Sequence, residues 1–372
     1  MRISGGQVFD LQRGFVSRDV CFDGELISDG CTGGEVYDAA GCYVIPGLTD
    51  LHFHGCMGAD FSDADAEGLE TMAKYELSRG VTQICPAGMT LLEEQLIKVC
   101  TVAADHRDAH RPGAELVGIN LEGPFLSMAK KGAQNGDWLH KPDVAMYRRL
   151  AEAGRGLVKL VSLAPEEPGA MEFIDELHDE VVISVAHTTA DYDTALEAYK
   201  RGAREATHLF NAMPPFSHRA PGVVGAAFDS AECRVELICD GVHIHPAVVR
   251  AVFKLFGAER VVLISDTMRA AGMPDGDYTL GGQDVKVTGK LATLADGTIA
   301  GSATDLMECL RTAVSFGIPL SDAVRAAAVN PTEVLGISGR YGTLEPGKAA
   351  NVVVLDGDLR VKDVFFRGAV VK

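Results

Sequence analysis

The chain has 372 residues, of which 47% are hydrophobic and 23% charged, and its formal net charge is −18. This composition is typical of a globular protein with a sizeable core, and the length predicts one large domain with a small one beside it. Nucleic acid is excluded as a partner because its phosphates require clustered Lys and Arg. A small anionic ligand would have to be held by a few local cations.

The spacing of the cysteines and the absence of long apolar runs indicate the cellular compartment of the protein. The nine cysteines are scattered without a CxxC pair, so neither a disulfide framework nor a zinc ribbon is suggested, and we expect reduced thiols. The N-terminal MRISGGQVFD lacks the apolar core of a signal peptide. No apolar stretch approaches the roughly 20 residues of a membrane span. We therefore expect a soluble, cytoplasmic protein.

The two ends of the chain have a β pattern. Residues 1–45 read as short strands separated by Gly, Asp and Cys, and residues 335–372 read as strands with turns at Pro346-Gly347 and Asp356-Gly357. Such pieces can bury their apolar faces only by combining. We therefore predict a small β-sandwich domain built from both chain ends, beside a larger domain at residues 46–334.

The larger domain alternates short apolar runs with amphipathic helical stretches. Several runs are nearly continuous Val, Ile and Leu, as expected for parallel strands buried on both faces. Eight such strands alternating with helices predict an α/β fold, a (β/α)8 TIM barrel, with a doubly wound open sheet as the alternative. Residues 277–302 read as β-hairpins inserted after the eighth strand. The eight runs are VIPGLTDLHFH, VTQICPA, LVGINLEGP, LVKLVSLAPE, VVISVAHT, EATHLFNA, VELICDGVH and VVLISDT.

The ends of these predicted strands carry metal-ligand residue types. Barrel enzymes place their working groups at the C-terminal strand ends. His52 and His54 lie two apart and should project to one face. The other strand ends carry Glu122, His187, His208, His243 and Asp266.

Imidazoles with a carboxylate, and without thiolates, suit Zn2+ or Fe2+. Several histidines with one carboxylate able to bridge favour two metals about 3.5–4 Å apart. Asp266 could then take the proton of an attacking water and return it to the leaving group. The pattern therefore predicts metal-dependent hydrolysis.

From about residue 40 to the end, the chain closely resembles the N-acetylglucosamine-6-phosphate deacetylases, a branch of the amidohydrolase superfamily. The resemblance rests on PGLTDLHFHG, LEGPF, AHTTA, THLFNAM, DGVHIHP, SDTMRAAGMPDGDYTLGG, IAGS and NPTEVLG…GTLEPGKAANVVVLD, and LEGPF combined with HLFNAM is specific to this branch. It implies a barrel of the metal-dependent amidohydrolase type with a split β-domain. It also implies removal of the acetyl group from N-acetyl-D-glucosamine 6-phosphate, which gives D-glucosamine 6-phosphate and acetate.

The resemblance also assigns roles to residues. It implies one or two divalent metals per chain and makes Asp266 the catalytic acid and base. The implied metal ligands are Glu122, His187 and His208, joined by His52 and His54 in members that bind a second metal. The implied substrate contacts are Asn211, Ala212, His243, Ile299, Ala300 and Gly301, with Ala133 and Gln134 near the sugar. Arg219 would bind the phosphate, and in this family it reaches the partner's site across a homodimer interface. Its guanidinium offers a bidentate fork for phosphate.

Two positions depart from the family pattern. Gln134 stands where some members have a histidine that contacts the sugar, and an amide cannot become cationic. Asn351 replaces the usual Asp of the superfamily in the small domain, where we expect no catalytic effect.

Alternative functions remain open from the sequence. The substrate could be the N-acetylgalactosamine 6-phosphate isomer or another N-acyl amide. A barrel that has lost its chemistry and serves as an assembly protein would usually lack ligands, and here none is missing.

Overall fold

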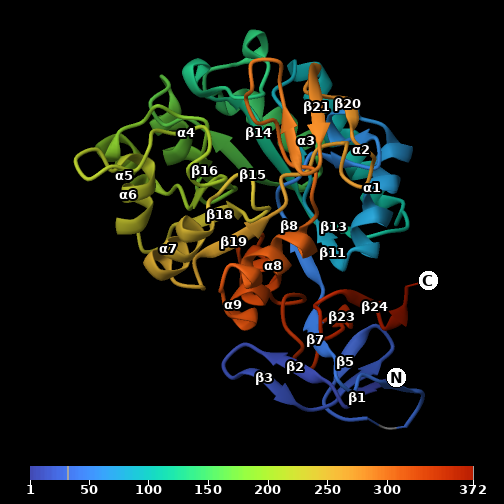
Figure 1. Cartoon of the computed structure of the whole chain (residues 1–372). Coiled ribbons are helices and arrows are strands. Elements are labelled where there is room, and N and C mark those ends of the chain that lie inside the picture. The colour runs from blue at the N-terminus through green and yellow to red at the C-terminus, as the bar shows by residue number, and fades with distance from the viewer. Residues whose placement is uncertain (32, 372) are drawn as a thin grey trace.

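The computed structural model describes residues 1–31 and 33–371. Its centre is a ring of eight strands, and each of the eight predicted apolar runs overlaps one of them (Figure 1). The paired neighbours in this ring are parallel. The strands are β8 (Leu48–Asp50), β11 (Val81–Ile84), β14 (Ile119–Phe125), β15 (Val158–Leu163), β16 (Val182–Val185), β17 (Glu205–Ala206), β18 (Arg234–Ile238) and β19 (Val261–Ile264).

Short connecting strands and one backbone hydrogen bond complete the ring. The pieces β12 (Ala87–Gly88) and β13 (Glu115–Leu116) bridge β11 and β14, since β12 pairs with β14 and β13 with β11. At the other junction the Asp266 N–H donates to the His52 carbonyl at 2.9 Å, which joins the segment after β19 to the segment after β8. The ring thereby brings residues more than 200 positions apart to one rim, and the parallel arrangement is consistent with the predicted TIM-type barrel.

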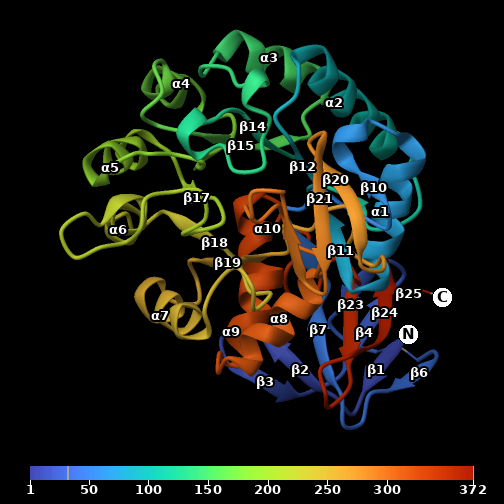
Figure 2. The same cartoon turned by 45° about the horizontal axis from the view of Figure 1, so that its top comes forward.

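Helices surround the strands on the outside (Figure 2). In α7, Val249, Val252, Phe253 and Phe256 are buried at the predicted helical spacing, and the His245 side chain accepts the N–H of Ala247 at the start of the helix. The helices are α1 (Ala66–Ser78), α2 (Glu93–Asp108), α3 (Val144–Ala153), α4 (Ala170–Leu177), α5 (Tyr192–Arg201), α6 (Gly222–Asp229), α7 (Pro246–Phe256), α8 (Leu306–Ser315), α9 (Leu320–Val324) and α10 (Asn330–Val334), with a π-helical turn (Arg325–Val329) between the last two.

Strands from both chain ends lie together below the barrel (Figure 1). One sheet has the order β5-β4-β1-β6 and the other β25-β24-β23-β7-β2-β3. Buried side chains from both sheets, including Val8, Phe22, Val352 and Phe365, form one apolar cluster. The strands are β1 (Arg2–Ser4), β2 (Gln7–Asp10), β3 (Gly14–Ser17), β4 (Val20–Asp23), β5 (Leu26–Ser28), β6 (Val36–Asp38), β7 (Tyr43–Pro46), β23 (Val352–Leu355), β24 (Val361–Phe366) and β25 (Ala369–Val370). The predicted association of the two ends is therefore present.

The predicted hairpins after the eighth strand are also present, as β20 (Gly276–Leu280), β21 (Gln283–Thr288) and β22 (Leu291–Thr293). Their apolar side chains pack with Met89 and Ala133 from two other loops, and the Gln283 amide donates to the Ala133 carbonyl. The hairpins therefore hold the 129–134 loop over the end of the barrel. A small hairpin of β9 (Gly55–Cys56) and β10 (Ala59–Asp60) follows the first barrel strand.

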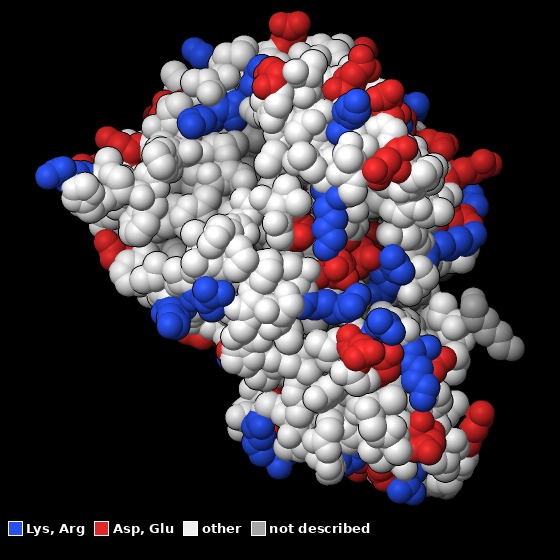
Figure 3. Space-filling model, viewed as in Figure 1, with Lys and Arg blue, Asp and Glu red and all other residues white. Residues whose placement is uncertain are grey.

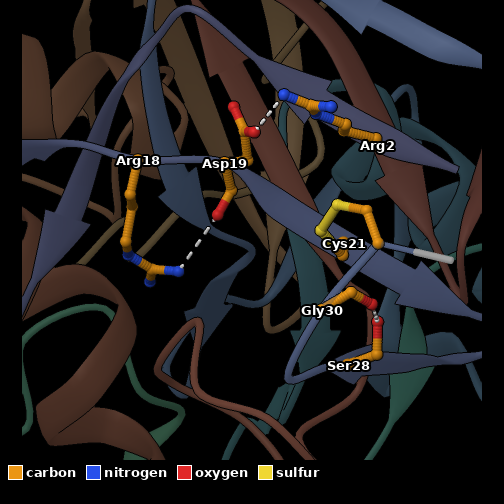
Figure 4. The surroundings of a disulfide bond; sticks show 7 residues. Arg2, Arg18, Asp19, Cys21, Ser28 and Gly30 are labelled. Carbon is orange, nitrogen blue, oxygen red and sulfur yellow. Dashed lines mark hydrogen bonds and ion pairs between the residues drawn. A yellow bond between two sulfur atoms is a disulfide. The ribbon is translucent and has the colours of Figure 1, made fainter.

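In the part of the chain that the structure describes, one disulfide joins Cys21 and Cys31 (Figure 4). The expectation of reduced thiols throughout is therefore wrong for this pair. The Cα atoms of the pair lie 5.2 Å apart because the chain turns back between β4 and residue 31, a proximity that spacing alone does not reveal. The other seven cysteines of the described chain are free and buried.

The surface charges and the apolar character of the helices concern the predictions that neither nucleic acid nor a membrane is a partner. On the face drawn in Figure 3, acidic and basic side chains are interspersed. In residues 1–31 and 33–371, no helix combines the length and the apolar character that a membrane crossing needs.

Candidate active site

The predicted site residues meet at the C-terminal rim of the barrel. The His52 and His54 rings lie side by side with centroids 5.5 Å apart, and Phe53 between them is buried in the core, as the alternation predicts. His187, His208 and Asp266 have φ values of 44°, 30° and 48°, in the left-handed region that non-glycine residues rarely adopt. Such backbone strain is typical of functional positions, where the surrounding structure holds a side chain in a required direction.

A cavity of about 480 Å3 opens over these groups. His52 lies at its base and is fully buried. Of the predicted residues, the cavity is lined by His54, Glu122, Ala133, Gln134, His187, His208, Asn211, Ala212, His243, Asp266, Ile299 and Gly301. Two predicted contacts are placed elsewhere. Ala300 is buried behind this wall, and Arg219 lines a separate hollow with Pro214 and Pro221. Ile299 and Gly301 on either side of Ala300 line the cavity, and the predicted substrate contact of Ala300 stays a prediction.

Potential metal ligands form two groups that share one wall. Glu122, His187 and His208 form the first, and His52, His54 and Asp266 the second; within each group the ligand atoms lie within 4.8 Å of one another.

Glu122 stands between the two groups. Its Oε1 lies 3.1 Å from His187 Nε2, 2.9 Å from His208 Nε2 and 3.5 Å from His52 Nε2. Its Oε2 lies 3.2 Å from His54 Nε2. Oε1 thus faces the first group and His52, whereas Oε2 faces His54, so the carboxylate lies within reach of both groups, as a bridging ligand does.

Hydrogen bonds at the outer ring nitrogens suit metal ligation. His54 Nδ1 lies 3.0 Å from the Ala87 carbonyl and His187 Nδ1 lies 2.8 Å from the Lys130 carbonyl. His52 Nδ1 lies 2.9 Å from Glu236 Oε2. Each acceptor fixes the proton on Nδ1 and leaves Nε2 free as a ligand. The buried Nε2 of His52 has no hydrogen-bond partner in the described chain, which fits a metal ligand.

The buried carboxylates give the site a negative potential. Burial alone raises the pKa of Glu122, but the histidines around it, led by His52, hold that pKa well below its ordinary value. Burial likewise lowers the pKa of His54, yet Asp266 and Glu122 raise it to about 10. A buried site of this kind favours cations, which can be protons on the imidazoles or a divalent metal.

Asp266 and His243 face the same cavity. Asp266 Oδ1 lies 3.3 Å from His54 Nε2, and although burial raises the pKa of Asp266, the hydrogen bond from His54 holds it below its ordinary value. Asp266 is therefore a carboxylate at neutral pH, ready to accept a proton. His243 Nδ1 lies 2.7 Å from Asp240 Oδ2. This contact orients the ring and leaves its other nitrogen, Nε2, available to a molecule bound in the cavity.

Gln134 lines the cavity, and its side-chain hydrogen bonds are made to the protein. Its amide donates to Glu122 Oε2 at 2.7 Å, and its oxygen accepts the backbone N–H of Thr90 at 2.7 Å. The side chain is only 2% exposed, so its polar atoms face the ligand carboxylate. Gln134 therefore holds Glu122 by a hydrogen bond, and its predicted contact with the sugar stays a prediction.

Sequence reasoning missed several residues of the site. Glu236 was detectable in principle, because it is a charged residue within the otherwise apolar strand VELIC. Lys130 lines the cavity, but as one of two adjacent lysines it carries no distinctive motif. The remaining missed wall residues, which only the packing reveals, are Met89, Ala129, Gly132, Leu280 and Thr298.

A parallel barrel with two groups of His and carboxylate ligands at its C-terminal rim defines a barrel hydrolase with a candidate two-metal centre. The sequence profile of the Amidohydrolase family matches residues 43–371, and the chain belongs to this family.

Individual relatives are also similar over most of their length. The chain is 38% identical to an N-acetylglucosamine-6-phosphate deacetylase of Bacillus subtilis (strain 168), over 90% of this chain and 86% of that protein. It is 34% identical to an N-acetylgalactosamine-6-phosphate deacetylase of Escherichia coli O157:H7, over 87% and 86%. Among solved structures, a mutant N-acetyl-D-glucosamine-6-phosphate deacetylase of Mycobacterium smegmatis, in complex with N-acetyl-D-glucosamine-6-phosphate, superposes with a TM-score of 0.93. That match is 34% identical and covers 100% of this chain and 98% of the other.

Proposed function

We propose that the protein is a metal-dependent hydrolase that removes the acetyl group from N-acetyl-D-glucosamine 6-phosphate, giving D-glucosamine 6-phosphate and acetate. The observation that carries the proposal is the position of Glu122 between two ligand groups on the wall of one cavity. Relatives at 32% to 38% identity that are named for this reaction support the substrate.

The first metal would be held by Glu122, His187 and His208, and a second by His52 and His54. We propose Zn2+ or Fe2+, since the donors are imidazole and carboxylate. When bound, the cations would polarise the acetyl carbonyl and lower the pKa of a water molecule.

The residues of this chain supply the proton transfers. Asp266 takes a proton from the attacking water while the water oxygen bonds to the acetyl carbon. Asp266 then gives that proton to the sugar nitrogen as the C–N bond breaks, so the nitrogen leaves as a neutral amine. The other product is acetic acid, which loses its remaining proton to water and becomes acetate. The low pKa of Asp266 makes it a carboxylate before the reaction, as the first step requires.

Substrate positioning is proposed for the cavity wall. Asn211, Ala212, His243, Ile299 and Gly301 surround the space that the sugar would fill. Lys130 adds a cation on the same wall, and the exposed Arg219 lies in another hollow of the same chain. We propose that Arg219 binds the phosphate in the partner subunit of a homodimer, because its own cavity is lined without it.

The domain boundaries and the location of the protein are also proposals. We propose that residues 1–45 and 335–372 form a small β-sandwich domain and residues 46–334 the catalytic barrel. The antiparallel pairing of Val353 with Ile45 in β23 and β7, which joins the two chain ends in one sheet, supports this division. A cytoplasmic location stays a prediction from the sequence.

Acetate release from N-acetylglucosamine 6-phosphate, measured beside metal analysis of the same sample, tests the proposal. We expect turnover with two metals per chain, and loss of turnover with retained metal in D266N. Loss of metal in D266N would make Asp266 chiefly a ligand, and no acetate release from a metal-loaded wild type would contradict the function.

The same assay with N-acetylgalactosamine 6-phosphate and with an unphosphorylated N-acyl amino acid tests the alternatives. One relative at 34% identity is named for the galactosamine isomer, so the epimer is the first comparison to make. Equal rates on the unphosphorylated amide would contradict a sugar-phosphate enzyme.

A further inference from the structure

Glu236 contacts both ligand groups from beneath the cavity. It lies in β18, is fully buried, and its Oε2 lies 2.9 Å from His52 Nδ1. The same oxygen accepts the backbone N–H of His208 at 3.0 Å. One carboxylate therefore holds a side chain of the second ligand group and the backbone of the first.

The contact with His52 decides which ring nitrogen is available. A carboxylate beside Nδ1 fixes the proton there, so Nε2 keeps its lone pair and points toward Glu122 Oε1, 3.5 Å away. His54 and His187 have neutral backbone carbonyls as their outer acceptors, whereas His52 has an anion. An anionic acceptor makes the imidazole a stronger donor to a cation.

The contact with His208 restrains an unusual backbone. His208 has a φ of 30°, and its Nδ1 has no hydrogen-bond partner in residues 1–31 and 33–371. Its ring is held by the contact of Nε2 with Glu122 Oε1 at 2.9 Å and by the backbone, which the hydrogen bond from its N–H to Glu236 restrains.

From these contacts we infer that Glu236 is a positioning residue that couples the two halves of the metal centre. It keeps His52 in the tautomer that can ligate the second metal and keeps His208 directed at the first. This inference rests on the metal centre of the proposed function but not on the identity of the substrate.

Glu205 provides a matched control on the neighbouring strand. It is also fully buried, and within the described chain both of its carboxylate oxygens lack hydrogen-bond partners. E205Q therefore changes an equally buried carboxylate in the barrel interior without removing a contact to a ligand histidine.

The test compares E236Q with E205Q in the full-length protein. Each protein is stripped with a chelator and titrated with Zn2+ against a chromophoric competitor, and the absorption spectrum of the Co2+-loaded form is recorded. Loss of an outer hydrogen-bond partner typically weakens metal binding by about 10- to 100-fold. We expect a loss of this size in the Zn2+ affinity of E236Q, with a changed Co2+ spectrum, and wild-type behaviour in E205Q.

The inference is wrong if E236Q binds two Zn2+ with wild-type affinity, if E205Q loses affinity equally, or if the wild type binds one. Should E236Q fail to fold, E236D takes its place, because the shorter side chain keeps the charge but withdraws the oxygen from His52. Metal binding is measured without substrate. A wild type that binds two metals but releases no acetate would therefore contradict the function and leave this test standing.

Discussion

Replacing Gln134 by methionine tests whether this residue serves Glu122 or the substrate. Methionine has a similar length and volume but cannot form the hydrogen bonds that the amide makes to Glu122 and to the Thr90 N–H. A hydrogen bond to a charged group contributes about 1.5–3 kcal/mol, and an unpaired buried N–H costs about 1–3 kcal/mol. These terms overlap, so we expect the free energy of unfolding of metal-free Q134M to fall by about 2–4 kcal/mol.

Urea unfolding of the metal-free protein, followed by far-UV circular dichroism, measures this change. Q95M is the control, because Gln95 makes a single hydrogen bond at an exposed helix start, and we expect a change below about 0.5 kcal/mol. Unchanged stability of Q134M together with a raised KM would refute the reasoning, since it would place the amide against the substrate.

Three further predictions follow from other parts of the molecule. R219A should raise KM for the phosphorylated sugar about 10- to 100-fold with little change in kcat. R219K should restore only part of the affinity, because Lys lacks the guanidinium fork. Steady-state kinetics measure both effects, and an equal rise in KM for an unphosphorylated amide would contradict a phosphate role. Treatment with a chelator should abolish acetate release and lower the melting temperature, and Zn2+ or Fe2+ should restore both; calorimetry that shows no shift would argue against the metal centre. Glu76 in α1 is fully buried, and its pKa is raised well above 4.5 by burial and by the nearby carboxylates of Asp50 and Asp305. The folded state therefore holds this proton more tightly than the unfolded chain, and the stability from that proton is complete below pH 4.5 and is lost as pH rises toward the folded pKa. Between those two pH values, the free energy of unfolding of E76Q should rise relative to that of the wild type by about 1.4 kcal/mol per pH unit. Urea unfolding measures both free energies, and a difference between them that stays constant from pH 5 to 8 would refute this prediction.

The sequence by itself determined the order of elements and the ligand types. Eight apolar runs of β character with helices between them can bury both strand faces only in a parallel arrangement covered by helices, and the barrel follows. His52 and His54 could be assigned to one face because backbone alternation is local. The location of Glu122 and Asp266 at the rim followed from the rule that barrel enzymes carry their active sites at the C-terminal ends of the strands.

Only the tertiary structure decided the contacts between strands. His52 and Glu236 are separated by 184 positions, and their hydrogen bond depends on how the ring closes. The direction of Gln134 depends on the loop that the β20–β22 hairpins hold in place, so its residue type could not reveal whether it faces sugar or Glu122. The guanidinium of Arg219 can bind phosphate, but only the packing of the loop that contains Pro214 and Pro221 places it in a hollow separate from the cavity. Local pattern fixes which groups are available, whereas long-range packing fixes which partner each group finds.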